Sequence, residues 1–249
     1  RVRKVAPRGR TQLAKLALLY QPGTTWEYSM STDVCGRLVE VVSGLGLDEY
    51  FAEHITGPLG MADTAFHVPL DRAHRFTSNY QLTPEDPLAT LDFFDASPYL
   101  SPPVFLSGGG GLVGTVDDYQ RFVDMLLNGG ELDGVRLLSP KTVELMTVNH
   151  LGDIPMGFGR DGVGFGLGVA VALDQGEIGE LGSPGEYNWG GAAGTRFWVD
   201  PEEDLVGIFM VQSIPHRTRA RSARTYFHTP RGPTRSLVVP SETAGPKIV

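Results

Sequence analysis

The spacing of apolar residues changes along this 249-residue chain, and the change limits the folds that the chain can adopt. The first part repeats apolar side chains at helical intervals, whereas residues 163–173 alternate glycine with apolar residues. Residues 195–199 and 205–211 are apolar, β-rich runs on either side of an acidic turn at residues 200–204, which is typical of a hairpin. Helices followed by antiparallel strands predict an α+β fold with helices packed on a C-terminal sheet.

Several helices are predicted ahead of that sheet. They span residues 13–20, 32–43, 47–55 and 117–128, and a further helix begins at Ser139-Pro140. In the helix over residues 117–128, the inward side chains are Tyr119, Phe122, Met125 and Leu126. The helix over residues 32–43 ends at Gly44, a typical C-terminal cap, and its apolar face consists of Val34, Leu38, Val41 and Val42. Cys35 lies on that face, which predicts a buried, unreactive thiol. The proline-rich residues 67–106 predict a long irregular excursion.

Charge divides the chain into three parts. Residues 1–12 are a basic segment, residues 13–213 form an acidic body, and residues 214–249 form a basic, proline-rich tail that we expect to be poorly ordered. An acidic body argues against nucleic-acid binding, although the basic ends could act as binding arms; flexible ends are the simpler interpretation. The apolar runs are too short to span a membrane. The sequence leaves the cellular compartment open.

Several kinds of chemistry have no motif in the sequence. No lysine follows glycine as a Walker-type phosphate loop requires, and no serine has glycine on both sides at the spacing of a nucleophile elbow. The histidines lack zinc-protease spacing, and one cysteine excludes a thiolate zinc cluster. Residues 109–114 match a dinucleotide-binding pattern, but we interpret them as a glycine-rich turn that packs closely. We expect neither a cofactor nor a metal.

Two segments carry the chemistry that the sequence does suggest. Residues 21–29 read QPGTTWEYS and residues 189–195 read WGGAAGT. Between them lie PLGMADT at residues 58–64 and SGGGGLV at residues 107–113. In this order the four segments resemble the serine β-lactamase-like hydrolases: class C β-lactamases, D-alanyl-D-alanine carboxypeptidases and related carboxylesterases.

The resemblance implies a fold and a mechanism. The fold is β-lactamase/transpeptidase-like, an antiparallel sheet flanked by helices, with a third motif on an edge strand. A serine in an S-x-x-K motif forms an acyl-enzyme with a small-molecule ester or amide substrate. Tyr28 matches the tyrosine that acts as general base. Trp189, Gly190 and Gly191 match the third motif, so that the backbone N–H of Ala192 would complete the oxyanion hole.

Three departures from the family pattern refine this hypothesis. No serine stands three residues before any lysine, so we expect the nucleophile helix and the N-terminal strands to precede this chain. Met30 replaces the asparagine of lactamases, and Trp189-Gly190 replaces their Lys-Thr. Both changes favour a carboxylesterase for short acyl esters. A β-lactamase, a D-alanyl-D-alanine carboxypeptidase and a non-catalytic binding module remain as alternatives.

Overall fold

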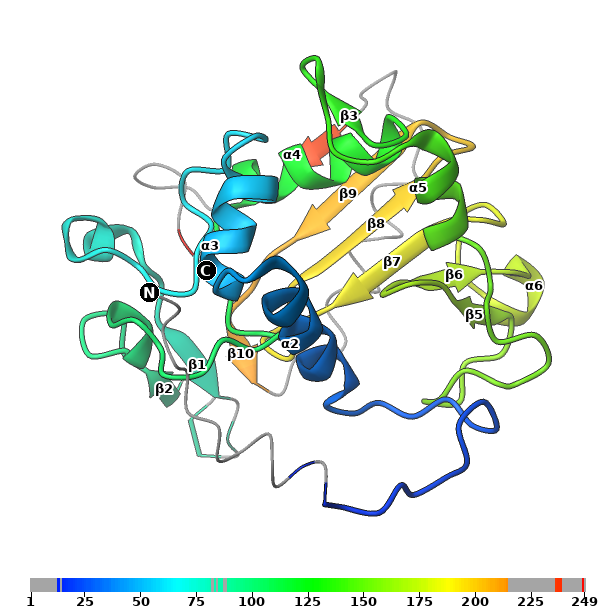
Figure 1. The fold of residues 1–249 in the computed structure, drawn as a ribbon, viewed down its shortest axis with the longest axis horizontal. Helices are drawn as coiled ribbons and strands as arrows, with labels where there is room; N and C mark the ends of the chain where they lie inside the picture. Colours follow the sequence, from blue (N-terminus) through cyan, green and yellow to red (C-terminus); the bar gives the residue numbers. More distant parts are fainter. Residues whose placement is uncertain are drawn as a thin grey trace.

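The computed structural model describes residues 13, 15–81, 83, 85–86, 89–214, 236–238 and 248. Its largest sheet has the strand order β11-β9-β8-β7-β6-β5 (Figure 1). The strands are β5 (Val163–Phe165), β6 (Ala170–Ala172), β7 (Tyr187–Gly190), β8 (Arg196–Asp200), β9 (Leu205–Phe209) and β11 (Ser236–Val238). Neighbours from β5 to β9 are antiparallel, whereas β11 pairs in parallel with β9. The α+β fold and the hairpin between β8 and β9 are therefore confirmed.

Four of the predicted helices are present. The helices are α2 (Ser31–Ser43), α3 (Leu47–Phe51), α4 (Val116–Leu127), α5 (Pro140–Met146) and α6 (Gln175–Ile178). A π-helical turn, Ala52–Thr56, continues α3, and 3-10 turns occur at Leu70–Arg75 and Pro98–Leu100. Side-chain caps fix where α4 and α5 begin, because Thr115 and Ser139 each accept a hydrogen bond from a backbone N–H in the first turn.

Of the helix predicted over residues 13–20, residue 13 is helical, but residues 15–20 are not, so most of the prediction is wrong. Residues 15–20 form a turn, bends and irregular backbone, and Leu16, Leu18 and Leu19 are exposed. A helix of eight residues is only marginally stable unless an apolar face packs on a neighbour. These leucines have no such burial, so composition alone was a poor guide.

The excursion over residues 67–106 contains strands that the sequence analysis missed. β1 (Asn79–Gln81) pairs with β2 (Ala89–Asp92) and, in parallel, with β10 (Ser213–Ile214). A separate short hairpin consists of β3 (Glu131–Leu132) and β4 (Val135–Arg136). Of the tail that begins at residue 214, the structure describes residues 214, 236–238 and 248, and the rest of that prediction lies outside the described residues.

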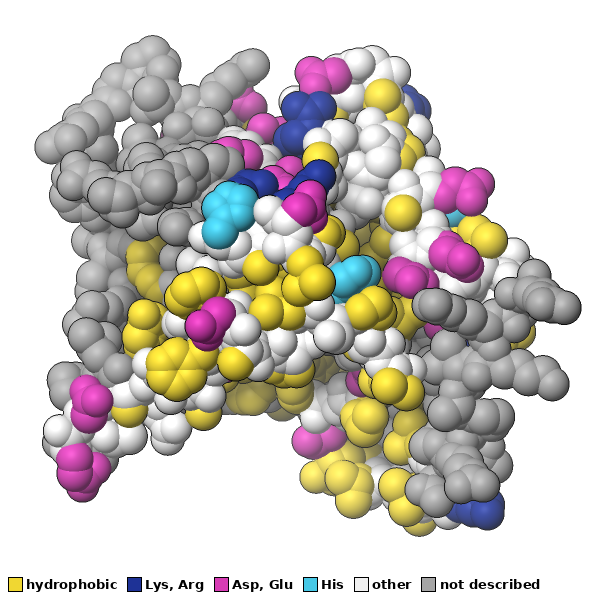
Figure 2. Space-filling view, turned by 90° about the vertical axis from the view of Figure 1, so that its left-hand side faces the viewer, with side chains coloured by type: hydrophobic (Ala, Val, Ile, Leu, Met, Phe, Trp, Pro, Cys, Tyr) yellow, Lys and Arg dark blue, Asp and Glu magenta, His cyan; other side chains and the backbone are white. Residues whose placement is uncertain are grey.

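An ion-pair network ties the excursion to α4. Asp63 accepts hydrogen bonds from Arg75 at 2.7 Å and from Arg72 at 2.8 Å. The Asp118 carboxylate accepts from the backbone N–H of Asp63 at 2.7 Å and from the Thr64 hydroxyl at 2.9 Å. The hydrogen bond from Arg75 lowers the pKa of Asp63, whereas burial raises the pKa of Asp118. Figure 2 shows basic and acidic side chains intermingled on this side of the molecule.

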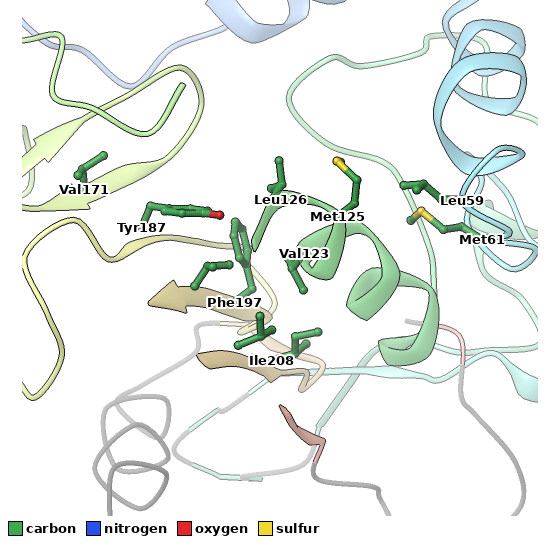
Figure 3. Close-up of a cluster of buried hydrophobic side chains, with 11 residues drawn as sticks. Leu59, Met61, Val123, Met125, Leu126, Val171, Tyr187, Phe197 and Ile208 are labelled. Atoms are coloured by element: carbon green, nitrogen blue, oxygen red, sulfur yellow. The ribbon is translucent and has the colours of Figure 1, made fainter. Parts of the chain in front are cut away.

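The main hydrophobic core lies between α4 and one face of the large sheet (Figure 3). Val123 of α4 points toward Phe197 and Ile208 of the sheet, while Met125 points toward Leu59 and Met61. Tyr119 and Phe122 pack against this cluster and are partly buried, which confirms the inward face predicted for the helix. Packing on α4 therefore fixes the position of the large sheet and of its strand ends.

Helix α2 buries a different face from the one that its apolar pattern predicted. Its buried residues are Gly36 and Glu40, while Cys35 is exposed, so the prediction of a buried thiol is wrong. The predicted stripe is also exposed, at Val34, Leu38, Val41 and Val42. The cause is close backbone packing: a Cβ on Gly108 would lie 2.1 Å from the carbonyl oxygen of Thr32. The glycine-rich run thus packs closely, as expected, against the face of α2 that carries Thr32 and Gly36.

Candidate active site

Tyr28 stands at the end of an irregular segment that leads directly into α2 (blue in Figure 1). The segment turns at Gly23, whose φ of 79° suits a glycine. Just before the helix, the hydroxyls of Ser29 and Ser31 share a hydrogen bond of 2.7 Å, and the backbone N–H of Ser31 also donates to Ser29. These contacts fix the backbone beside Tyr28, whose side chain is 63% exposed.

Trp189 lies near the end of β7, where the strand turns back into β8. The backbone N–H of Gly191 donates to the carbonyl oxygen of Thr195 at 2.8 Å, and the N–H of Gly194 donates to Gly191 at 3.0 Å. A Cβ on Gly191 would lie 2.3 Å from the Thr195 hydroxyl oxygen, so a larger residue here would displace the Thr195 side chain. Because β6 and β5 extend the sheet beyond β7, this strand is interior, and its expected edge position is wrong.

Gly190 and Ala192 lie on either side of Gly191. Gly190 ends β7 and pairs with Arg196 of β8. A Cβ on Gly190 would lie 3.0 Å from the Arg196 side chain, which leaves little room for a larger residue. Ala192 is exposed within the turn. Its role as an oxyanion donor stays a prediction.

The structure brings the two predicted motifs together. The rings of Tyr28 and Trp189 stack, with centroids 6.4 Å apart and planes inclined by 18°. Trp26 meets the edge of Trp189 at 6.5 Å, and Phe165 of β5 contacts both tryptophans at 5.2 Å. Phe158 completes the group, at 5.5 Å from Trp26 and 5.9 Å from Tyr28. We call these five residues the aromatic cluster.

The aromatic cluster passes from the core to the surface. Trp189 packs against the main core, and Trp26 and Phe165 are also half-buried. Tyr28 and Phe158 are exposed. The cluster can therefore hold an apolar group at the surface while its inner rings keep a fixed position.

Tyr28 differs from the tyrosines of the core in its surroundings. Burial raises the pKa of Tyr119 and of Tyr187 above the ordinary value, which keeps both phenols neutral. Both belong to or pack against the core beneath the sheet. An exposed phenol next to a strand end is the better placed of these groups to exchange a proton with a bound substrate.

Phe158 and Phe165 belong to this site but were not predicted from the sequence. Each stands between two glycines, in Gly157-Phe158-Gly159 and in Gly164-Phe165-Gly166. The repeated pattern was a usable signal, because bulky aromatic residues between glycines imply rings that extend from a closely packed backbone.

Three other features bear on the function of the described residues: a histidine site, a metal-binding group and a membrane-spanning helix. His150 is exposed, and its Nε2 lies 2.7 Å from the carbonyl oxygen of Leu145, while its backbone N–H donates to the carbonyl oxygen of Phe165 at 2.9 Å. Among the described residues, no group of three or more His, Cys, Asp or Glu side chains is arranged to hold a metal ion. None of the described helices combines the length and hydrophobicity needed to cross a bilayer.

Comparison with known proteins gives consistent matches. A family model described as Beta-lactamase matches residues 6–228. An uncharacterized protein of Mycobacterium tuberculosis is 39% identical over 215 residues, which cover 82% of this chain and 52% of the relative. The lovastatin esterase of Penicillium rubens is 30% identical over 230 residues, covering 84% of this chain and 55% of that enzyme.

A solved structure agrees with the sequence matches. EstCE1, described as a hydrolase with promiscuous acyltransferase activity, is 26% identical and superposes with a TM-score of 0.66. The match covers 85% of this chain and 57% of that chain. The present chain thus spans about half the length of the relatives that it matches.

Proposed function

The chain belongs to the Beta-lactamase family, and from that premise we propose that it forms part of the acyl-transfer site of a serine carboxylesterase. Tyr28 is the general base, and the strand end from Trp189 to Ala192 binds the substrate. One observation carries the proposal: two motifs far apart in the sequence, assigned separately, meet with their rings stacked 6.4 Å apart. That contact puts a phenol beside the end of a strand.

The proposed reaction follows from these positions. A serine hydroxyl attacks the ester carbonyl carbon, and the oxygen of Tyr28, in its deprotonated phenolate form, accepts the hydroxyl proton. The carbonyl oxygen gains negative charge, to which the N–H of Ala192 donates. When the carbonyl re-forms, the alcohol leaves with the proton from Tyr28, and the acyl group stays on the serine. Water or a second alcohol then repeats these steps to release the acyl group.

The serine and its lysine are not supplied by this sequence in the S-x-x-K spacing. The proposal therefore assigns them to polypeptide outside these 249 residues. The relatives are longer than this chain, which matches only 52% and 55% of their lengths, and this is consistent with that assignment.

Two features support esters over lactams as substrates. Trp189-Gly190 stands where lactamases carry Lys-Thr, so the lysine that would hold a substrate carboxylate is replaced by an aromatic ring. Met30 likewise replaces the asparagine that contacts an amide side chain. The names of two relatives, an esterase and a hydrolase with acyltransferase activity, point the same way.

The test begins with the reading frame upstream of Arg1. If it encodes S-x-x-K, the longer polypeptide is expressed with Tyr28→Phe and, as a control, with Tyr80→Phe in strand β1, a tyrosine that is not part of the aromatic cluster. Tyr28→Phe keeps the ring that stacks on Trp189 but removes the hydroxyl, so we expect kcat/KM for p-nitrophenyl butyrate to fall by about 10²–10⁴. Tyr80→Phe should have little effect. Native kcat/KM in Tyr28→Phe would refute the assignment.

A second candidate, a non-catalytic binding module, is favoured by the absence of S-x-x-K in the sequence. A fluorophosphonate probe separates the two candidates. If a stop codon lies just upstream of Arg1 and no serine is labelled, the esterase proposal is refuted, and the chain is a non-catalytic remnant or a binding module. Labelling of a serine within these 249 residues would instead show that the motif assignment is wrong.

A further inference from the structure

Phe158 has a backbone conformation that its side chain disfavours. It lies in the loop between α5 and β5, and its φ of 69° is in the left-handed region. Glycine or asparagine adopts this region readily, whereas a bulky aromatic residue does so at a cost in free energy. The ring is 66% exposed, so burial of apolar surface offsets little of that cost. A residue kept in this state suggests a role outside folding.

The contacts of Phe158 show where the ring is held. Its ring centroid lies 5.5 Å from that of Trp26 and 5.9 Å from that of Tyr28. The loop lies close to the cluster as well, because a Cβ on Gly157 would lie 2.9 Å from ring atoms of Trp26. Gly159, with φ of 60°, lets the chain turn away directly afterwards. The loop therefore presents one exposed ring to the rim of the aromatic cluster, beside Tyr28.

The rim has an apolar character. Phe158 makes its ring contacts with aromatic side chains, while Arg160, two residues later, lines a polar pocket with Glu177 and Glu186. A flat uncharged ring can stack on or against the exposed aromatic rings, whereas the negative face of an aromatic ring does not attract a carboxylate.

We propose that Phe158 determines substrate specificity by binding an uncharged aryl group of the substrate at the rim of the aromatic cluster. The inference rests on the proposed function for the position of the reacting ester. The aryl group could belong to the acyl side or to the alcohol side of the ester. Methyl phenylacetate and benzyl acetate are isomers that differ in this respect, and methyl acetate carries no aryl group.

The first experiment measures hydrolysis by the longest natural polypeptide that contains this sequence. The readout is the ratio of kcat/KM for each aryl ester to that for methyl acetate. We expect Phe158→Ala to lower the ratio about tenfold for one isomer, which identifies the side that is bound; this corresponds to the 1.4 kcal/mol of a tenfold change. Phe93→Ala removes an exposed ring elsewhere and should leave the ratio unchanged. Equal ratios in the native protein and in Phe158→Ala would overturn the proposal.

A second variant separates specificity from structure. Phe158→Gly removes the ring but suits the left-handed backbone, so its melting temperature should be equal to or above the native value while the aryl preference is lost. A lower melting temperature together with native aryl preference would show that the ring is only structural. Phe158→Tyr keeps an aromatic ring and should retain the preference.

Direct binding distinguishes a failure of this inference from a failure of the proposed function. Binding of methyl phenylacetate and benzyl acetate to the 249-residue chain is followed by tryptophan fluorescence, since Trp26 contacts Phe158. Binding that Phe158→Gly abolishes, in a protein that hydrolyses no ester, would support the aryl site and reject the esterase. Ester hydrolysis in which Phe158→Gly leaves the ratio of kcat/KM for aryl esters to that for methyl acetate unaltered would support the esterase and reject the aryl site. If the protein neither binds nor hydrolyses aryl esters, the inference is overturned.

Discussion

The close packing of Gly108 on α2 provides a quantitative prediction for Gly108→Ala. The added Cβ would lie 2.1 Å from the carbonyl oxygen of Thr32 and 3.0 Å from the backbone nitrogen of Gly36. Both atoms belong to the helix backbone, so no side-chain rotation can relieve the contact. Either α2 or the glycine-rich run must move.

The expected loss of stability follows from that displacement. Overpacking of this kind costs about 1–3 kcal/mol. For a protein of this size each 1 kcal/mol shifts the melting temperature by about 2–4 °C, so Gly108→Ala should melt about 2–12 °C lower. Because Tyr28 immediately precedes α2, esterase activity in the longer polypeptide should fall as well.

Gly110→Ala is the matched control in the same run of glycines. A Cβ on Gly110 would have no heavy atom within 4 Å, and its φ is not in the left-handed region. The alanine should leave the melting temperature unchanged or raise it slightly, because it restricts the unfolded chain. Thermal melts by circular dichroism, at equal protein concentration, compare the two variants. Equal melting temperatures for Gly108→Ala and Gly110→Ala would refute the packing argument.

Two further predictions concern the ion-pair network and the exposed face of α2. Arg75 lowers the pKa of Asp63, so the stabilisation from Asp63 is present above the pKa of the unfolded chain, about 4, and is lost as the pH falls further. Asp63→Asn should therefore cost about 1–3 kcal/mol in urea denaturation at pH 7 and much less at pH 3, and an equal cost at both pH values would contradict this. Cys35 is exposed, so a disulfide reagent should label one thiol in the native 249-residue chain without denaturant. Labelling that requires urea would show that the thiol is buried.

The sequence predicted the elements whose signals are local. The hairpin of β8 and β9 follows from two β-rich runs around an acidic turn, and α4 and α5 follow from capping residues and an amphipathic pattern. Strands β1 and β10 escaped detection because each is short and its partner is remote in sequence, which no local pattern encodes. The sequence predicted the existence of α2 but not its buried face, since the packing of Gly36 on Gly108 is a tertiary contact.

The residues of the candidate site likewise include some that local sequence motifs predicted and some that they did not. Tyr28 and Trp189 were assigned from motifs, and their contact could not be derived from spacing alone. Phe165 belongs to a predicted alternating segment, yet its contact with Trp26 depends on the path of the segment before α2. Phe158 was missed because its conformation opposes its intrinsic preference, and residues of that kind tend to occur at functional sites.

The small sheet around β1 has a consequence for the order of folding. Tyr80 pairs with Ser213, and Phe76 forms a bridge with Ile248, so one short stretch is joined to partners from the far end of the chain. Such contacts must close long loops before they gain any stabilising interaction, which slows folding. During synthesis the stretch leaves the ribosome long before its partners exist. We expect it to be among the last parts to acquire native structure, with its strand edges open to other chains until then.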